Sequence, residues 1–222
     1  MNNQEELKLT TGILELQELG ANYWSVPKCG NTSIKFACLR AQGNSFQQDP
    51  EDIYVAVHAV GLAPYIEKKR ALQNGLLNFT IIRHPVERAL SMYRDLAGKR
   101  QGKRIDGSAE FKLAWQTFLG SKHSFDRFVD LMCNFRDKDK DWHFRSFYPR
   151  LTTGKKKIGP ELIICLEDLD MRSGELNAML NTPIEIPALH QTDRSGQASP
   201  AAAQKLAELW VRDFSLWETN KL

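Results

Sequence analysis

The stretch WSVPKCGNTSIKFACLR, residues 24–40, sets the expected fold of this 222-residue chain. It contains an apolar run that ends at Val26, a loop over residues 27–31 and a helix that opens at Thr32 and Ser33. Apolar residues then recur at helical spacing on one face, namely Ile34, Ala37, Cys38 and Ala41. N–H groups at the start of such a hydroxyl-capped helix have no partner within the helix, and the helix dipole favours negative charge there. The segment therefore predicts a strand, a loop and a helix that together bind a phosphate-type anion, with Lys28 adding a positive charge.

The loop differs from that of nucleotide-triphosphate-binding proteins, which place a lysine directly before a hydroxyl residue in the pattern G-x-x-x-x-G-K-[ST]. Here Lys28 comes ahead of the turn, and no second glycine precedes it. A structural turn followed by a capped helix is the simpler alternative. A lysine-first loop resembles the 5′-phosphosulfate loop of sulfotransferases that use 3′-phosphoadenosine 5′-phosphosulfate (PAPS). That resemblance implies that PAPS is the co-substrate and that its phosphosulfate is bound by Lys28, Cys29, Gly30, Asn31, Thr32 and Ser33.

A second stretch, FTIIRHPVERALSMYRDL over residues 79–96, predicts another strand followed by a helix. Arg83 ends the strand, Pro85 suits the first helical turn, and Ser91 falls two turns into the helix. A guanidinium and a hydroxyl so placed can bind one phosphate together. The structural alternatives are an ion pair of Arg83 with an acidic neighbour such as Glu87, and an ordinary mid-helix hydroxyl at Ser91.

The words RHPVERALSMYRD resemble the 3′-phosphate motif of carbohydrate sulfotransferases, written R-[DN]-P-x-x-R-x-x-S-x-[YF]. His84 departs from the acid or amide that is usual at its position. The resemblance implies that Arg83 and Ser91 bind the 3′-phosphate of the nucleotide, within an α/β sulfotransferase fold similar to that of P-loop proteins. Because the two phosphate-type motifs occur in the family's order, the chain is identified as a member of the carbohydrate sulfotransferase (sulfotransferase family 2) group.

Three later segments are also similar to this group. DWHFRSFYPRL, residues 141–151, matches a histidine-containing segment through His143, although the glutamine of that segment is missing. IPALHQTDRSGQ, residues 186–197, resembles a late loop from which Arg194 would reach the 3′-phosphate. The words LWVRDFSLW near the end of the chain resemble the closing helix with its Asp-Phe pair, which begins here at Asp213.

Strand-like and helix-like stretches alternate along the chain. Apolar runs predict strands at residues 21–26, 53–58, 78–83 and 161–166, whereas residues 62–73 and, more loosely, residues 3–19 are predicted to be helical. Strands separated by helix-length stretches indicate a central parallel sheet flanked by helices, an α/β fold that we expect to form a single domain over residues 1–222. Ligands of such sheets gather at the carboxyl ends of the strands. We therefore expect Val26, His58 and Arg83 at that edge.

The composition fits a globular protein, with 42% hydrophobic and 26% charged residues. The net charge of +3 does not by itself indicate a nucleic-acid partner, and we expect none.

No apolar run approaches the roughly 18 to 20 residues of a membrane span, and the polar start MNNQEELKLTTG does not resemble a signal peptide. The four cysteines lack metal-ligand spacing, and Cys38 and Cys165 lie in apolar runs. We therefore expect thiols, no metal ion and a cytoplasmic protein without a membrane segment. Many eukaryotic carbohydrate sulfotransferases carry a Golgi membrane anchor. Because we expect no membrane segment in this chain, we expect a bacterial origin.

The resemblance implies in-line transfer of SO₃ from PAPS to a hydroxyl or an amine, with a carbohydrate as the expected acceptor. Negative charge grows on the bridging oxygen as its bond to sulfur breaks, so a cation and N–H donors are needed there, and Lys28 and residues 30–33 would supply them. PAPS has no β,γ-phosphate chain for a metal to bridge, so no Mg²⁺ requirement is expected. A general base must take the proton of the acceptor. His58 is the first candidate and His143 the second, against the alternatives of a histidine that closes a strand and one that packs beside Trp142.

Two other functions fit the same motifs. A small-molecule kinase with a P-loop-like fold would use ATP with Mg²⁺ and would need an acid after a strand, for which Glu167 and Asp168 are the candidates. A nucleotide-binding protein without catalysis would keep the fold and lack the base. The basic run from Lys99 to Arg104 fits either a flexible solvated loop or a site for an anionic acceptor. A glycan, a lipid-linked sugar and a small hydroxylated metabolite all remain open as acceptors.

Overall fold

The computed structural model describes residues 12–45, 64–99, 105–153, 157–187 and 197–222, and these fall into two compact units. The sheet unit consists of the described residues within 1–82, 149–191 and 220–222. The helical unit consists of those within 83–148 and 192–219. Each unit has a hydrophobic core of its own.

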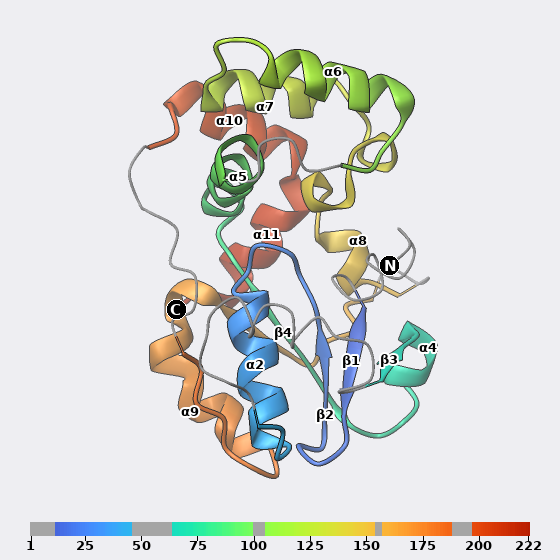
Figure 1. Ribbon diagram of the computed structural model, residues 1–222. Helices are drawn as coiled ribbons and strands as arrows, with labels where there is room; N and C mark the ends of the chain where they lie inside the picture. The colour runs from blue at the N-terminus through green and yellow to red at the C-terminus, as the bar shows by residue number, and fades with distance from the viewer. Residues whose placement is uncertain (1–11, 46–63, 100–104, 154–156, 188–196) are drawn as a thin grey trace. The chain divides into compact units, whose positions relative to one another are not determined.

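The sheet unit is built on a five-stranded mixed sheet (Figure 1). In sheet order the strands are β3 (Tyr65–Ile66), β1 (Ile13–Leu16), β2 (Ala21–Trp24), β4 (Leu77–Ile82) and β5 (Leu162–Cys165). β2, β4 and β5 pair in parallel, whereas β1 is antiparallel to both β2 and β3. The predicted α/β class is confirmed, and β2, β4 and β5 lie close to their predicted limits. The strand predicted at residues 53–58 lies outside the described residues.

Two predictions about the early part of the chain were wrong. The helix predicted loosely over residues 3–19 is, in its described part, strand β1 followed by a turn in which Gly20 has a φ of 67°. The helix predicted over residues 62–73 is, where described, strand β3 followed by the short helix α4 (Lys68–Ala71). In β1 the side chains alternate between the two faces, which is the period of a strand. The sheet is therefore mixed rather than wholly parallel.

One face of the sheet is covered by α2 (Asn31–Ala41) and α9 (Leu169–Met179) (Figure 1). Tyr23 of β2 pairs in register with Phe79 of β4, which pairs with Leu162 of β5, so these rings and side chains form one row on this face. The row and its neighbours pack against the helices in a single core that includes Leu14, Leu16, Ile34, Ala37, Cys38, Ile81, Ile164 and Leu176. The predicted apolar face of the helix after β2 is thus confirmed, and it fixes that helix to the sheet.

The opposite side of β1, β2 and β4 carries a buried polar network. Glu15 is 2% exposed and accepts hydrogen bonds from Arg70 at 2.7 Å and from Asn74 at 3.1 Å. Asn22 donates to the side-chain oxygens of Asn74 and Asn78 at 2.9 and 3.2 Å. Because these groups are paired with one another, the network joins α4 to the sheet without the cost of an isolated buried carboxylate.

Gly159 lies against the indole of Trp24 in the sheet unit. A Cβ at this position would lie 2.8 Å from Cζ2 of Trp24. We expect Gly159→Ala to lower the free energy of unfolding by about 1–3 kcal/mol, because a packed ring must move. Gly174 in α9 is the matched control, since a Cβ there meets nothing within 4 Å, and Gly174→Ala should raise stability by about 0.5–1 kcal/mol. Urea unfolding measures both changes, and a Gly159→Ala protein as stable as the parent would contradict the expectation.

The helical unit contains most of the helices between β4 and β5 and the last helices of the chain. They are α5 (Pro85–Tyr93), η1 (Arg94–Lys99), α6 (Ala109–Leu119), α7 (Phe125–Cys133), η2 (Asp137–Asp139), η3 (Trp142–Phe144), α10 (Pro200–Leu209) and α11 (Val211–Asn220), while α8 (Tyr148–Leu151) and η4 (Leu166–Asp168) complete the described elements (Figure 1). Two of these helices have serine N-caps, since Ser124 accepts from Arg127 N–H at 3.4 Å and Ser199 accepts from Ala202 N–H at 3.1 Å. An aromatic core formed by Phe111, Trp115, Phe128 and Phe144 holds the helices together.

Candidate active site

The loop between β2 and α2 has an unusual backbone. Lys28 has a φ of 67°, in the left-handed region that side chains other than glycine rarely adopt, and it is the only such non-glycine among the described residues. Gly30 has a φ of 72°, and a Cβ there would lie 3.1 Å from the side chain of Leu166. Strained conformations of this kind persist where the surrounding structure enforces them, and they cluster at functional sites. The backbone of the loop is therefore consistent with the predicted anion site.

The start of α2 is suited to an anion. The helix begins at Asn31, with Gly30 at the N-cap and no side-chain cap, so the prediction that Thr32 and Ser33 cap this helix was wrong. The first turn carries no acidic residue, and the first intrahelical bond runs from Ile34 N–H to the carbonyl of Gly30 at 3.0 Å. A left-handed glycine leaves the cap position without a side chain, and N–H groups at such a helix start are of the kind that bind anions.

The residue that links β2 to this loop adds a buried hydroxyl. Ser25 is 3% exposed, and its Oγ has no hydrogen-bond partner among the described residues. Most buried hydroxyls in proteins have a hydrogen-bond partner. The helix start, with the glycine at its cap and partly buried Lys28 in the loop before it, is of a kind that suits an oxyanion such as a phosphate or a sulfate ester.

The second predicted segment has the local structure that its sequence indicates. Arg83 directly follows β4, Pro85 opens α5, and Ser91 lies in the last turns of that helix, 6% exposed. Arg83 makes an ion pair with Glu87 at 3.5 Å, which is the structural alternative that the sequence allowed. The pair is long and its glutamate is half exposed, so it holds the guanidinium only weakly. After Ser91 the helix continues as the π-helix η1, a form found often at functional sites.

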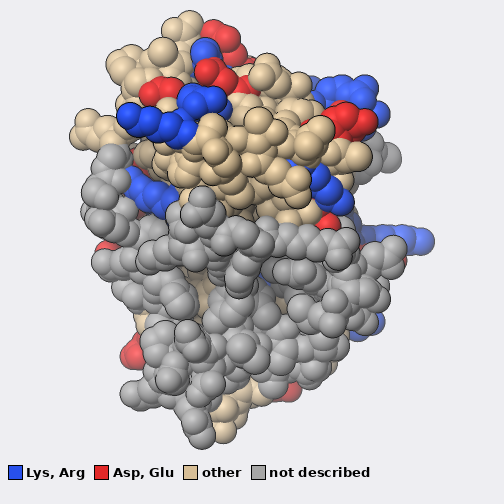
Figure 2. All heavy atoms as spheres, turned by 45° about the horizontal axis from the view of Figure 1, so that its top comes forward, with Lys and Arg blue, Asp and Glu red and all other residues tan. Residues whose placement is uncertain are grey.

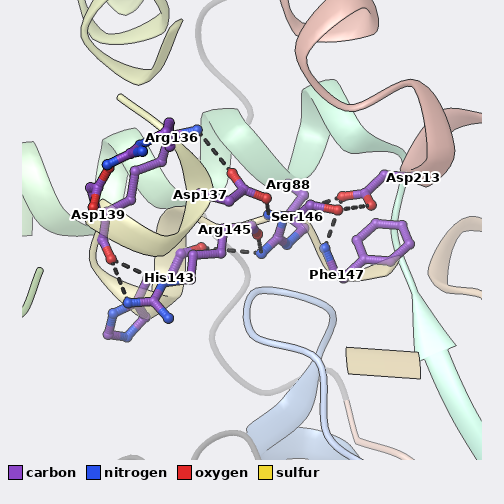
Figure 3. Close-up of polar contacts among 10 residues, drawn as sticks. Arg88, Arg136, Asp137, Asp139, His143, Arg145, Ser146, Phe147 and Asp213 are labelled. Carbon is purple, nitrogen blue, oxygen red and sulfur yellow. Dashed lines mark hydrogen bonds and ion pairs between the residues drawn. The ribbon is translucent and has the colours of Figure 1, made fainter. Parts of the chain in front are cut away.

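Arg88 is a residue of this segment whose role the sequence did not reveal. Its side chain is fully buried in the helical unit, and its guanidinium donates to the carbonyls of His143 and Arg145 at 3.1 and 2.9 Å (Figure 3). It also lies 5.3 Å from the ring of Trp210, in cation–π range. Arg88 therefore supports the segment that carries His143. Its place as the second arginine of the quoted motif is the signal that could have pointed to it.

Asp213 holds the other side of the same segment. Its carboxylate accepts from Ser146 Oγ at 2.5 Å and from the N–H groups of Phe147 and Tyr148 at 3.0 Å each, and one oxygen lies 3.9 Å from Arg88 (Figure 3). Burial raises the pKa of the Asp213 carboxyl, and Arg88 and these hydrogen bonds oppose the shift without reversing it. The Asp-Phe pair of the closing helix thus has a structural task, which is to fix residues 146–148.

His143 is paired with a buried acid. Its Nδ1 lies 2.7 Å from Oδ1 of Asp141, and its ring stacks on that of Trp142 with 3.4 Å between centroids. The histidine side chain is 18% exposed, so it can meet a substrate, while Asp141 is buried. The alternative of a histidine that packs beside Trp142 is present as a contact, but the acid partner gives the ring a defined orientation that suits a base. Asp141 was also missed in the sequence.

His58 and Arg194 lie outside the described residues. Glu167 and Asp168, the acids that a kinase would use, lie in η4, and Asp168 accepts from the N–H of Leu222 at 2.9 Å. Within the described residues, no group of three or more His, Cys, Asp or Glu side chains is placed to hold a metal ion.

Lys35, in the helix α2 that follows the loop, is a buried lysine that the sequence motifs did not indicate. Its Nζ donates to the hydroxyl of Tyr65 at 3.0 Å, and the side chain has no exposed surface. Burial lowers the pKa of Lys35 to about 7. The same burial raises the pKa values of Tyr65 and of nearby Tyr23, so both phenols keep their protons in the neutral range.

This lysine should make stability rise with pH. Between pH 7 and about 10.4 the unfolded chain binds one more proton than the folded chain at Lys35, so the free energy of unfolding increases, by up to about 1.4 kcal/mol per pH unit. Lys35→Met should remove this part of the slope and give its largest stabilisation near neutral pH. Urea unfolding of both proteins from pH 6.5 to 9.5 measures it, and parallel pH profiles would contradict the assignment.

The charged surface is mixed. On the face drawn in Figure 2, Lys and Arg side chains lie among Asp and Glu side chains over the described part of the chain. This mixture is typical of a solvated surface rather than of a single-sign field. No helix in the described ranges is both long enough and apolar enough to span a bilayer.

The structure is an α/β fold in which β2 is followed by a loop with left-handed Lys28 and Gly30 and then by helix α2. The model of the Sulfotransferase family matches residues 20–218, a range that contains both predicted phosphate motifs. The chain belongs to this family, and the activity that membership supports is sulfotransfer. No curated protein and no solved structure matches the chain.

Proposed function

We propose that this protein transfers a sulfuryl group from PAPS to a hydroxyl or amine of an acceptor. The observation that carries the proposal is the loop after β2, where left-handed Lys28 and Gly30 lead into a helix start without a side-chain cap or an acidic first turn. Family membership supports sulfotransfer in general, and a PAPS-type donor is the sulfuryl source that the family implies. The identity of the donor as PAPS, the class of the acceptor and the choice of the base are parts of our proposal.

Charge development explains why these residues would serve the reaction. The bond between sulfur and the bridging phosphate oxygen breaks, a new bond forms from sulfur to the acceptor atom, and the acceptor proton passes to a base. Negative charge grows on the departing 5′-phosphate, where the ammonium of Lys28 and the N–H groups of residues 30–33 would stabilise it. Cys29, Asn31, Thr32 and Ser33 shape this loop, and the buried hydroxyl of Ser25 is a further donor. No metal ion is needed in this scheme.

We assign recognition of the nucleotide 3′-phosphate to Arg83 and Ser91, with Arg194 as a third contributor. Arg83 is 19% exposed and its ion pair with Glu87 is long, so its fork of donors can turn to a dianion. Ser91 offers a short hydroxyl from the helix that Arg83 precedes. Arg83→Ala should therefore weaken binding of the bisphosphate product more than it changes kcat.

The base is one of two histidines. His143 has the orienting carboxylate and the exposure that a base requires, and it is our choice from the described residues. His58, at the end of the predicted second strand, stays the other candidate. If His143→Ala keeps full turnover while His58→Ala loses it, the assignment moves to His58.

A carbohydrate hydroxyl is the proposed acceptor, because the 3′-phosphate segment resembles that of carbohydrate sulfotransferases. The basic residues from Lys99 to Arg104 would then meet an anionic glycan. All four cysteines are thiols rather than disulfides, and this supports our placing of the protein in the reducing cytoplasm.

The proposal is tested by turnover of PAPS carrying a labelled sulfuryl group, with a panel of sugars, lipid-linked sugars and small alcohols. We expect transfer to at least one panel member without added Mg²⁺ and in the presence of EDTA. Thermal shift is the parallel measurement: adenosine 3′,5′-bisphosphate should stabilise the protein, and ATP with Mg²⁺ should not. The opposite preference would indicate a kinase, and stabilisation by the bisphosphate without any turnover would indicate a nucleotide-binding protein that has lost catalysis.

A further inference from the structure

The carboxylate of Asp141 makes more hydrogen bonds than a helix N-cap requires. It is buried at the start of η3, where its Oδ1 accepts from the backbone N–H of His143 at 2.8 Å and lies 2.7 Å from Nδ1 of the same residue. Its Oδ2 accepts from the backbone N–H of Asp106 at 2.6 Å. One carboxylate thus fixes both the backbone and the ring of His143, and it is itself fixed by a separate segment of the helical unit.

The ring and the backbone of His143 are each restrained by one further contact. Its face stacks on the indole of Trp142 at an interplanar angle of 29°, and Trp142 is buried. Its carbonyl accepts from Arg88 at 3.1 Å (Figure 3). Rotation of the imidazole would break the bond to Asp141 and the stack together, so a single ring orientation is favoured.

This arrangement decides which ring nitrogen carries the proton. An ionised carboxylate can only accept hydrogen bonds, so Nδ1 facing it must donate, and the lone pair of the neutral ring is then on Nε2. Burial raises the pKa of the Asp141 carboxyl. The hydrogen bonds and charge of His143 and the N–H of Asp106 together lower this pKa by more than burial raises it, so the net shift is downward. The carboxylate therefore stays ionised at neutral pH.

We propose that Asp141 is a positioning residue that holds His143 as the Nδ1–H tautomer and so presents Nε2 as the atom that accepts the proton of the acceptor. This inference rests on the proposed function, in which His143 is the base. The proton leaves the acceptor oxygen or nitrogen as its bond to sulfur forms, His143 becomes imidazolium, and the ionised Asp141 stabilises that cation without taking its proton.

The first test measures the tautomer itself and needs no substrate. In the parent, ¹⁵N shifts of the imidazole, recorded above the titration range of His143, should show protonated Nδ1 and unprotonated Nε2. The Asp141→Asn variant should shift the population of the His143 ring toward the Nε2–H tautomer. The asparagine amide offers one acceptor oxygen to the three N–H groups that donate to Asp141, namely the backbone N–H groups of Asp106 and His143 and the Nδ1–H of His143. The NH₂ group of the amide must therefore face one of these groups, which favours moving the ring proton from Nδ1 to Nε2. A parent ring in the Nε2–H form would overturn the proposal, whatever the variant does.

The second test is a kinetic cycle. Asp141→Asn should lower kcat about 10- to 100-fold with little change in KM for PAPS, by analogy with the range found when the partner that orients a metal-binding histidine is lost. In a His143→Ala background the same change should have no further effect, because Asp141 would act through His143. Equal losses in both backgrounds would show a merely structural role and overturn the proposal. Asp139→Asn is the matched control, since its carboxylate pairs with Arg136 at 2.8 Å on the same segment.

The two tests separate this inference from the proposed function. If the tautomer is Nδ1–H and depends on Asp141 but His143→Ala keeps full turnover, the base assignment fails while the positioning by Asp141 stands. If PAPS is not turned over at all, the ¹⁵N measurement on the parent still decides the positioning.

Discussion

Lys28→Ala is expected to lower kcat for sulfuryl transfer by about 100- to 1,000-fold, the range measured when one donor to a developing oxyanion is removed. The bridging oxygen gains negative charge only as the sulfur bond breaks, so an ammonium beside it stabilises the transition state more than bound PAPS. Binding of the bisphosphate product should also weaken. Pre-steady-state transfer of labelled sulfuryl separates the chemical step from product release, and a variant that transfers at the parent rate would remove Lys28 from the mechanism.

The backbone at this position provides a sharper control than alanine alone. Lys28 has a φ of 67°, so alanine keeps the conformational strain, whereas Lys28→Gly removes the side chain and relieves the strain. We expect both variants to lose activity to the same extent, while only the glycine variant matches or exceeds the parent in stability. A glycine variant that stays active would show that the loop conformation, and not the charge, is what matters. Lys69→Ala, at an exposed position in α4, controls for the loss of one positive charge.

The parts of this fold that were predictable are those in which neighbours in sequence determine the structure. The strand that leads to Val26 and the helix after it could be predicted from the local pattern of apolar residues alone. The start of α5 could be predicted from a single residue, Pro85. Strand β1 was missed because four residues, ILEL, carry little periodicity, and their strand form depends on pairing with β2 across the turn at Gly20. Local pattern cannot distinguish such a short run from one side of a helix.

The candidate site divides in the same way. Residues 28–33 are contiguous, so a motif could indicate them, although Gly30 rather than a hydroxyl residue proved to be the cap. Arg88 and Asp213 are distant in sequence, and their partners are mostly backbone groups of residues 143–148, which have no side-chain signature. A buried pair of this kind appears only once the chain is folded. The phosphate motif contains Arg88, but it did not indicate that this arginine binds the backbone of the segment with His143.

Asp213→Ala is expected to lower the free energy of unfolding by about 3–5 kcal/mol, because it leaves the buried charge of Arg88 without its carboxylate. The N–H groups of Phe147 and Tyr148 and the hydroxyl of Ser146 would lose their acceptor at the same time. Asp213→Asn should cost less, since the amide oxygen can still accept from some of these donors. Guanidinium unfolding followed by fluorescence and circular dichroism ranks the variants, and an alanine variant as stable as the parent would show that the network carries no net stability.

The exposed pair of Asp130 with Lys205 provides the comparison, because Asp130→Ala removes a carboxylate from the same unit without leaving a buried charge unpaired and should change stability little. The location of the Arg88–Asp213 network gives its loss a second consequence. Arg88 donates to the carbonyl of His143, and Asp213 fixes residues 146–148, so the loosened segment is the one that carries the proposed base. At a temperature where Asp213→Asn is still folded, we therefore expect kcat to fall while binding of the bisphosphate product is unchanged. A loss of product binding instead would mean that this network supports the nucleotide site and not the base.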